Sequence, residues 1–496
     1  MKILLLYPEF PNTFWSFKYA LRFIGKKSAF PPLGLLTVAA LLPDTWETRL
    51  VDLNVSKLGK KDLDWADCAF ISGMIVQKNS AKDIIRQCKE AGLRIVAGGP
   101  MFSEADADFE AVDHFVLNEA EITLPLFLAD LEKGAPQHMY STTVFPDLDA
   151  TPVPRWGLAQ LKRYASMCIQ YSRGCPHNCD FCNVTALLGH RVRTKTTRQV
   201  LAELDGLYNL GWREDVFFVD DNFIGNKRKL KTDLLPALIE WRKSGHNIHF
   251  HTEASIDIAD DPELMRLMVD AGFNRIFIGI ETPDNDCLAE CSKRQNENRD
   301  LVRDVKKIQQ AGLQVQAGFI VGFDNDKTSV FDRQIEFIQN SGIVTAMVGL
   351  LQAPPGTRLY QRMKDEGRLL GDSTGDNADG TTNIVPLMGL SRLQTGYKEI
   401  LGHIYSPKHY YARLKTFLKE YSPPSHELRS RITFPKLVAF GRSIIRLGVL
   451  GRERFHFWKM LIWIRFRRPK LLHLSVTLAI YGYHFRKIYQ RNVAAR

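Results

Sequence analysis

The chain has 496 residues, of which 45% are hydrophobic and 24% are charged. This length and balance predict two or three globular domains and exclude a disordered tail, a collagen or a pure coiled coil. The net charge of +11 is concentrated at the carboxyl end, because residues 429–496 hold 16 Lys and Arg against one acid, Glu453. The preceding residues are therefore net acidic, and the basicity belongs to one terminal region.

The eight cysteines are few for this length, and three of them crowd into eight positions. This spacing does not suit a disulfide framework and predicts a reducing compartment. The apolar run Ile3–Tyr7 is too short for the core of a signal peptide and runs straight into Pro8. We therefore expect a cytoplasmic protein.

Residues 1–140 alternate short β-rich runs with helical patterns, as a doubly wound, Rossmann-like α/β domain requires. The predicted strands are Lys2–Tyr7, Thr48–Leu53, Cys68–Ile75, Arg94–Ala97 and His114–Leu117. The predicted helices lie near Leu33–Leu42, Asn79–Ala91 and Glu119–Glu132. Ligands of such sheets bind at the carboxyl ends of the strands, so the loops that follow the strands are the ones to watch.

A proline-rich stretch within residues 141–165 predicts an extended linker. Over residues 166–386 the alternation resumes with a longer period and gives six βα units, which predict a partial, TIM-like (βα)6 barrel. Its predicted strands are Met167–Tyr171, Val216–Val219, His249–Glu253, Arg275–Ile280, Val315–Val321 and Ala346–Leu351. Residues 387–496 form a basic region that we expect to be helical.

Cys175, Cys179 and Cys182 form C-x-x-x-C-x-x-C directly after the first barrel strand. Three thiolates at this spacing suit a [4Fe–4S] cluster whose fourth iron has no protein ligand and is open to chemistry. The alternatives are a zinc site with His177 as its fourth ligand, or three unrelated thiols. Neither accounts for a position at the mouth of the barrel.

At these cysteines the sequence resembles the radical S-adenosylmethionine (SAM) enzymes, whose hallmark is C-x-x-x-C-x-aromatic-C, with Phe181 as the aromatic residue. The resemblance implies that the open iron binds the amino and carboxylate groups of SAM. It also implies that an electron from the cluster cleaves SAM to a 5′-deoxyadenosyl radical.

The same resemblance implies further contacts with SAM at the ends of later barrel strands. The implied SAM residues are Asp220, Asp221, Asn222, Glu253, Ser255, Glu281 and Ile320, the last within G-F-I-V-G. The acid that usually follows that strand is displaced to Asp324, to which we assign no contact. Each acid taken alone reads as a helix cap or a solvated loop residue; their shared position at strand ends favours function. The other cysteines are predicted to be structural: Cys68, Cys88, Cys168, Cys287 and Cys291.

The first domain is similar to the cobalamin-binding domain of cobalamin-dependent radical SAM enzymes. The residues that the resemblance assigns to cobalamin follow the third and fourth strands: Ser72, Gly73, Gly98, Gly99 and Pro100. The alternative is that these glycines only turn the chain. The sequence lacks the D-x-H-x-x-G motif that supplies a histidine to cobalt in other cobalamin proteins, and residues 1–150 hold only His114 and His138. A degenerate domain that only shapes a substrate cavity also remains open.

The basic carboxyl-terminal region interleaves Lys and Arg with aromatic and aliphatic residues, a pattern that favours a helix in the interface of an anionic bilayer. RNA binding and a solvated face packed on the barrel are the alternatives. The uncharged stretch Leu471–Phe485 is too short and too polar to predict a membrane span.

Together these features predict an enzyme, a cobalamin-dependent C-methyltransferase that resembles the subgroup of hopanoid methylases and archaeal lipid-ring synthases. The resemblance implies a lipid-like or other apolar substrate and a reductant such as flavodoxin or ferredoxin. The basic carboxyl-terminal region predicts a peripheral contact with the inner face of the membrane. The alternatives are a radical SAM cyclase or C–C coupling enzyme without methyl transfer, and an iron–sulfur sensor. Nucleic acid is not an expected partner.

Overall fold

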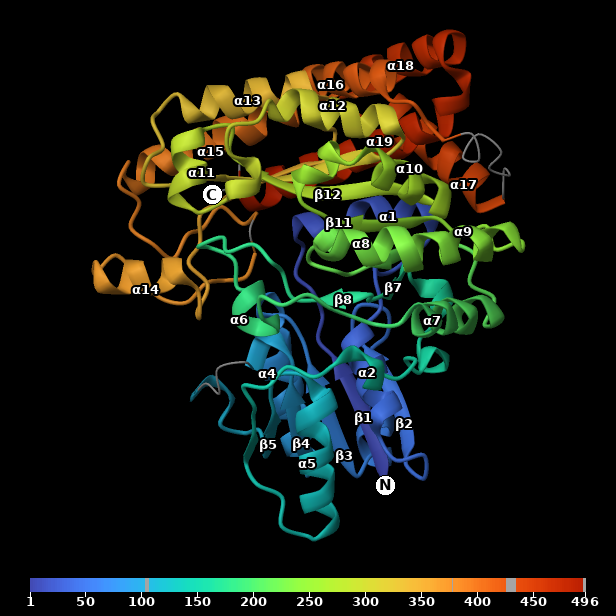
Figure 1. Ribbon diagram of the computed structural model, residues 1–496, viewed down its shortest axis with the longest axis vertical. Coiled ribbons are helices and arrows are strands. Elements are labelled where there is room, and N and C mark those ends of the chain that lie inside the picture. Colours follow the sequence, from blue (N-terminus) through green and yellow to red (C-terminus); the bar gives the residue numbers. More distant parts are fainter. Residues whose placement is uncertain (103–106, 377, 425–433, 494–496) are drawn as a thin grey trace. The chain divides into compact units, whose positions relative to one another are not determined.

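The computed structural model describes residues 1–102, 107–376, 378–424 and 434–493 (Figure 1). The chain divides into two compact units. The first unit comprises Met1–Pro11, Lys27–Gly174 and Leu187–Val219, and the second comprises Asn12–Lys26, Cys175–Ala186 and Asp220–Arg496. Arg429 and Arg431, which begin the basic region, lie outside the described residues.

The first unit contains a six-stranded parallel sheet in the order β2-β1-β3-β4-β5-β6. Its strands are β1 (Lys2–Tyr7), β2 (Glu47–Asp52), β3 (Cys68–Ser72), β4 (Arg94–Gly98), β5 (His114–Val116) and β6 (Met139–Tyr140). The predicted doubly wound domain is therefore confirmed. Two details differ: the predicted third strand ends at Ser72, before a short 3-10 helix at Ile75–Gln77, and the sheet gains β6.

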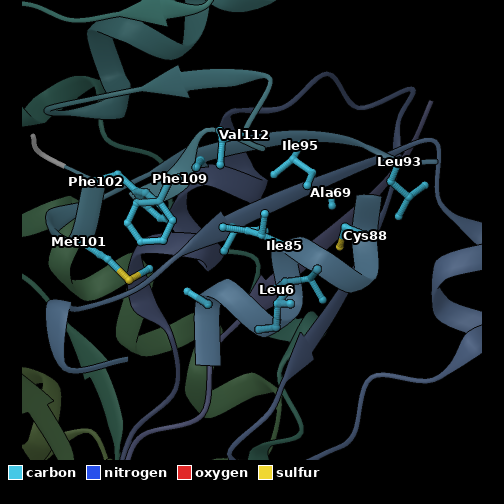
Figure 2. Packing of buried hydrophobic residues seen from close by; sticks show 14 of the residues in the cluster. Leu6, Ala69, Ile85, Cys88, Leu93, Ile95, Met101, Phe102, Phe109 and Val112 are labelled. Atoms are coloured by element: carbon cyan, nitrogen blue, oxygen red, sulfur yellow. The ribbon is translucent and has the colours of Figure 1, made fainter. Parts of the chain in front are cut away.

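Alternating side chains of β1 contribute to two separate hydrophobic cores. Leu4 and Leu6 belong to one core and Ile3 and Leu5 to the other, since successive side chains of a strand point to opposite faces. The first core is covered by α4 (Lys78–Glu90), whose Ile85 and Cys88 are seen near Leu6 and Ala69 (Figure 2). The buried residues of α4 recur at helical spacing, so the helix lays one apolar stripe on the sheet.

Glu119 and Glu121, which follow β5, form buried ion pairs within this unit. Arg173 contacts Glu119 at 2.5 Å and Glu121 at 2.8 Å, and Arg193 contacts Glu119 at 2.7 Å. The two arginines lie on the short antiparallel pair β8 (Ser172–Arg173) and β9 (Arg193–Thr194). These acids therefore help to hold the chain around β8 in place.

The second sheet has the order β14-β13-β12-β11-β10-β7 and confirms the predicted partial barrel. Its strands are β7 (Met167–Ile169), β10 (Val216–Phe218), β11 (Phe250–Glu253), β12 (Phe273–Glu281), β13 (Gln314–Val321) and β14 (Ala346–Leu350). The helices between them include α7 (Thr197–Asn209), α9 (Leu235–Lys243), α10 (Pro262–Ala271), α12 (Leu301–Ala311) and α13 (Val330–Ser341). The carboxyl ends of these parallel strands carry the candidate site.

Beyond the barrel the described chain is helical, as predicted (Figure 1). The main helices are α15 (Leu390–Ile404), α16 (Pro407–Glu420), α17 (Phe434–Ser443), α18 (Arg454–Arg467) and α19 (Leu472–Ile488). Most of α19 is buried, including much of the uncharged stretch noted in the sequence. Among the described residues, none of the helices combines the length and apolar character that a membrane crossing needs.

Asn12–Lys26 leaves the first sheet after β1 and belongs to the second unit. The ring of Phe14 stacks on Phe485 of α19 with 4.1 Å between centroids, and the Phe14 carbonyl lies 2.9 Å from Nε2 of His484. The following helix α1 (Lys18–Ile24) contacts α17 and α19. These contacts fix the position of Trp15, which projects from the same segment.

Candidate functional site

The three motif cysteines lie on one loop that leads into the short helix α6 (Val184–Leu188). All three are free and half-buried. Burial, with a contribution from the neighbouring Cys179, raises the pKa of the Cys182 thiol to about 12. Burial raises the pKa of Cys175 as well, again with a contribution from Cys179. Three half-buried thiols on one loop fit the cluster that the sequence predicts.

Within the described residues, no three His, Cys, Asp or Glu side chains converge tightly enough to hold one metal ion. A [4Fe–4S] cluster does not need such convergence, because each of its cysteines binds a different iron. The arrangement of the three cysteines is therefore compatible with the cluster that the sequence predicts.

Asp220, Asp221 and Asn222 follow β10, and Glu253 ends β11. Burial raises the pKa of Asp221 to about 6. Burial, together with the charges of Asp221 and Asp220, raises the pKa of Glu253 to about 8. When they are ionised, these neighbouring carboxyl groups repel one another. A bound ammonium group would relieve this repulsion.

Asn222 joins the cysteine loop to the end of β11. Its side chain is a hydrogen-bond partner of Cys175, and its Oδ1 accepts a bond of 3.3 Å from the backbone N–H of Ser255. Asn222 is only 4% exposed. This buried amide therefore fixes two of the predicted SAM-binding segments relative to each other.

Glu281 ends β12 in the left-handed backbone region, with φ of 64°. Its Oε1 lies 2.7 Å from Nζ of Lys293, and the two side chains are 8% and 12% exposed. Burial lowers the pKa of Lys293, but the charges of Glu281 and Cys179 outweigh burial and leave that pKa raised. Lys293 thus brings a cation to the cluster loop. Lys293 could not be predicted, because a single lysine in a polar loop has no distinguishing sequence pattern.

Phe181 and Ile320 pack against one hydrophobic cluster that includes Cys287, Cys291 and Phe323. The sulfur of Cys287 is a hydrogen-bond partner of Asp326, and both of these cysteines are buried, as are Cys68, Cys88 and Cys168. Asp324, to which no contact was assigned, forms an ion pair of 2.6 Å with Arg368. The acid after the G-F-I-V-G strand is therefore occupied by a structural contact.

Trp15 is a second residue that the sequence prediction missed. Its indole Nε1–H donates to the sulfur of Met347 on β14 at 3.0 Å, and its ring meets Phe277 of β12 edge-on at 5.3 Å. A Cβ added at Gly318 of β13 would lie 3.0 Å from Phe277 and 3.6 Å from Met347, so these side chains converge over that glycine. The aromatic run in N-T-F-W-S-F after the first strand was the available signal.

The predicted cobalamin residues lie at the carboxyl ends of β3 and β4 in the first unit, the edge where ligands of such sheets bind. A Cβ at Gly98 would approach the backbone oxygen of Val116 to 2.4 Å. Gly99 has φ of +91°, and a Cβ there would lie 2.4 Å from Oγ of Ser72. The fold itself requires both glycines, so they do not by themselves identify a ligand.

Residues 169–338 match the radical SAM superfamily, and residues 357–496 match a domain of unknown function (DUF4070). An uncharacterized methyltransferase of Synechocystis sp. is 42% identical over 98% of this chain and 91% of its own length. The hopanoid C-2 methylase of Rhodopseudomonas palustris is 34% identical over 92% of this chain and 88% of its own.

Solved structures of cobalamin-dependent radical SAM enzymes share the fold. OxsB, with aqua-cobalamin and SAM bound, has a TM-score of 0.63 at 16% identity and covers 100% of this chain and 80% of its own. TsrM from Kitasatospora setae, with cobalamin and a [4Fe–4S] cluster bound, has a TM-score of 0.61 at 15% identity, over 92% of this chain and 98% of its own. The cofactors predicted from the sequence are those that these two enzymes carry. By its likeness to the two methyltransferases along nearly its whole length, together with the superfamily match over the barrel, the chain belongs to the radical SAM methyltransferases.

Proposed function

We propose that this enzyme is a cobalamin-dependent C-methyltransferase that acts on an unactivated carbon of a lipid-like or other apolar substrate. When bound, the cofactors supply a 5′-deoxyadenosyl radical and a transferable methyl group. The hopanoid C-2 methylase is named for a lipid substrate, which supports this substrate class. Cytoplasmic localisation and a flavodoxin or ferredoxin as reductant stay predictions.

The observation that carries the apolar substrate is the wall formed by Trp15, Phe277 and Met347. Phe277 is the register neighbour of Glu253 on the adjacent parallel strand, and register neighbours point to the same face of a sheet. The aromatic wall therefore adjoins the carboxyl cluster. A site with charged groups on one side and aromatic and thioether groups on the other suits a polar cofactor beside an apolar substrate.

The residues of this chain have distinct roles in the proposal. Cys175, Cys179 and Cys182 hold the cluster. The carboxyl groups of Asp221 and Glu253 bind the ammonium group of SAM, and Lys293 offers a cation to its carboxylate. Phe181 and Ile320, which share one apolar cluster, border the adenosyl portion.

Cobalamin is proposed to bind at the carboxyl edge of the first sheet. His114 begins β5, its Nδ1 lies 2.7 Å from the carbonyl of Gln137, and His138 Nδ1 lies 2.8 Å from the carbonyl of Asp113. Both rings thus lie toward the amino end of β5, away from the binding edge. We expect protein purified with hydroxocobalamin to retain it without a histidine from this domain on cobalt, which electron paramagnetic resonance of the reduced cofactor would show.

The reaction is tested with methyl-labelled SAM, a reductant and an apolar lipid extract under anaerobic conditions. The proposal requires S-adenosylhomocysteine, 5′-deoxyadenosine and a labelled lipid in the same reaction. Production of 5′-deoxyadenosine with an unmethylated, rearranged product would establish a cyclase instead. Replacement of the three cluster cysteines by Ala should abolish every product and the bound iron, of which we expect about four per chain. Cys88→Ala, in the core of the first unit, is the matched control and should keep both.

A further inference from the structure

Large hydrophobic side chains gather on the outer surface of the carboxyl-terminal helices. Among the described residues, 22 large hydrophobic side chains are exposed, and nine of them lie within residues 437–466. Single exposed hydrophobic residues are ordinary, whereas a concentration of this kind marks a surface that meets something else. Residues 437–466 lie within the segment 357–496 that matches the DUF4070 domain.

Helix α18 is apolar on two opposite faces. Its inner face packs against α16 and α19 through Phe457, Met460, Leu461 and Ile464. Its outer face carries an apolar stripe at a spacing of three to four residues, which we call the outer stripe: Phe455 (75% exposed), Trp458 (42%), Ile462 (59%) and Phe466 (80%). Burial of the inner face stabilises the fold, whereas the outer stripe stays exposed and contributes less in this way.

The outer stripe continues into the turn that precedes the helix. Nε1 of Trp458 donates to the carbonyl of Gly448 at 2.9 Å, which holds α18 against the π-helical turn Ile444–Val449. Val449 and Leu450, beside this contact, are 58% and 74% exposed. The apolar surface therefore spans two successive elements that are held together by a hydrogen bond.

The charges around the outer stripe have one sign. Glu453 is the single acid in residues 434–470, and it is buried in an ion pair of 2.5 Å with Arg486. The exposed charged residues of this stretch are therefore basic, and they include Arg452, Arg454, Lys459, Arg465, Arg467 and Lys470. An anionic partner is favoured, and a second copy of the same basic surface is disfavoured by repulsion.

We propose that the outer stripe docks on the surface of an anionic bilayer, with α18 parallel to the membrane plane. The apolar side chains enter the boundary between headgroups and acyl chains, and the basic side chains meet the anionic headgroups. RNA would use the charges, and its exposed bases could stack on the aromatic rings, but the exposed aliphatic side chains Ile462, Val449 and Leu450 would be left without a partner. The proposal concerns the binding surface alone and does not depend on the methylation chemistry.

Two further residues of this region, one basic and one aromatic, are engaged in contacts between the helices. The guanidinium of Arg468 donates to the carbonyls of Leu418 and Lys419, both at 2.9 Å, at the end of α16. Trp463 is half-buried, with Lys415 over its ring. Both residues therefore serve the packing of the helices, and the docking role falls to the outer stripe.

The test uses the full chain and vesicles of phosphatidylcholine with and without about 30% phosphatidylglycerol, because basic residues respond to anionic lipid. The triple variant Phe455→Ser, Ile462→Ser, Phe466→Ser removes the most exposed side chains of α18, so its fold should persist. We expect it to weaken vesicle binding by about 30-fold or more. The matched control replaces three exposed leucines elsewhere by serine, Leu126→Ser, Leu210→Ser and Leu387→Ser, and should bind like the wild type.

A second variant, Arg454→Gln, Lys459→Gln, Arg465→Gln, Arg467→Gln, should weaken binding to the anionic vesicles by about 100-fold or more. Its control makes the same charge change at the exposed Arg86, Lys133, Lys243 and Arg266 and should bind like the wild type.

Circular dichroism checks the fold of each variant. Wild-type binding by the serine triple variant would overturn the proposal, as would equal wild-type binding to the two kinds of vesicle. Conversion of a wild-type oligomer to a monomer by the serine triple variant, or binding of tRNA at physiological salt as tight as that of vesicles, would also overturn it.

Discussion

Nζ of Lys293 lies 2.7 Å from Oε1 of Glu281 in a site where both side chains are largely shielded from water. Removal of one partner leaves the other charge buried and uncompensated, which is costly. We expect Lys293→Met to lower the free energy of unfolding by about 3 kcal/mol, whereas Glu281→Leu combined with Lys293→Met should recover much of the loss. Anaerobic urea denaturation measures both.

The matched control for this ion pair is Lys243→Met. Its partner Glu240 lies at 2.7 Å as well, but the side chains are 67% and 71% exposed. An exposed pair contributes about 1 kcal/mol at most, so the control should unfold nearly as the wild type does. If Lys293→Met and the double variant Glu281→Leu, Lys293→Met lost equal amounts of unfolding free energy, the loss would not come from an unpaired charge.

Glu253 should release a proton when SAM binds. Its pKa of about 8 means that the carboxyl group is mostly protonated at pH 7 in the unliganded protein, chiefly because of burial. A bound ammonium favours the ionised form and lowers this pKa, so proton release is expected between the lowered pKa and pH 8. Isothermal titration calorimetry in buffers of different ionisation enthalpy measures the released proton.

In Glu253→Gln this group no longer titrates, and the buffer dependence of the binding enthalpy at pH 7 should fall toward zero. The exposed Glu240→Gln provides a variant with the same chemical change outside the site. If Glu253→Gln bound SAM with the buffer dependence of the wild type, another group would be the proton donor.

His484 should make the stability of the second unit fall in acid. Burial lowers its pKa to about 4, below the ordinary value of 6.5. Below pH 6.5 the unfolded chain takes up a proton that the folded ring refuses until pH 4, so stability is present above pH 6.5 and is lost as pH falls between these values. The loss is about 1.4 kcal/mol per pH unit over that window, or about 3 kcal/mol in all.

His484→Gln keeps a side-chain N–H that can donate to the Phe14 carbonyl but cannot titrate. Its unfolding free energy should therefore depend less steeply on pH between 4 and 6.5. The exposed His190→Gln serves as control. Parallel pH profiles for the wild type and His484→Gln would rule out the role given to His484.

Most of the fold could be predicted because its elements have strong periodic signals. Successive residues of β1, such as Leu5 and Leu6, are apolar because each face of that sheet is covered, and such runs are easily recognised. β6 has only two residues, Met139 and Tyr140, so it offered no pattern. The short 3-10 helix at Ile75–Gln77 continues an apolar run, and such a run predicts a strand.

The site was predictable where a motif fixed the spacing and was missed where only the fold brings residues together. Cys175, Cys179 and Cys182 are close in the sequence, whereas Lys293 reaches this loop from beyond β12. At Gly98 the sequence pattern predicts a function that the fold does not require. The pattern predicts that cobalamin approaches the backbone at this glycine, but the nearby Val116 carbonyl already requires a residue without a side chain. A bulky residue at Gly98 would therefore disturb the sheet rather than report on cobalamin.

Trp15 should determine how well the apolar substrate binds. The indole is held by Met347 and Phe277, so Trp15→Ala removes a large apolar surface beside the carboxyl cluster. We expect KM for the substrate to rise by about 10-fold to 100-fold, since a buried aromatic ring contributes roughly 1.5–3 kcal/mol. Trp15→Phe keeps an aromatic ring, and its KM should lie closer to that of the wild type.

Substrate in detergent micelles removes the bilayer from the measurement, and Phe466→Ser, on the outer stripe, should then retain the wild-type KM. The rate of SAM cleavage without substrate should be unchanged in Trp15→Ala, which separates substrate binding from the cofactor site. An unchanged KM together with slower SAM cleavage would instead assign Trp15 to the support of the cofactor site.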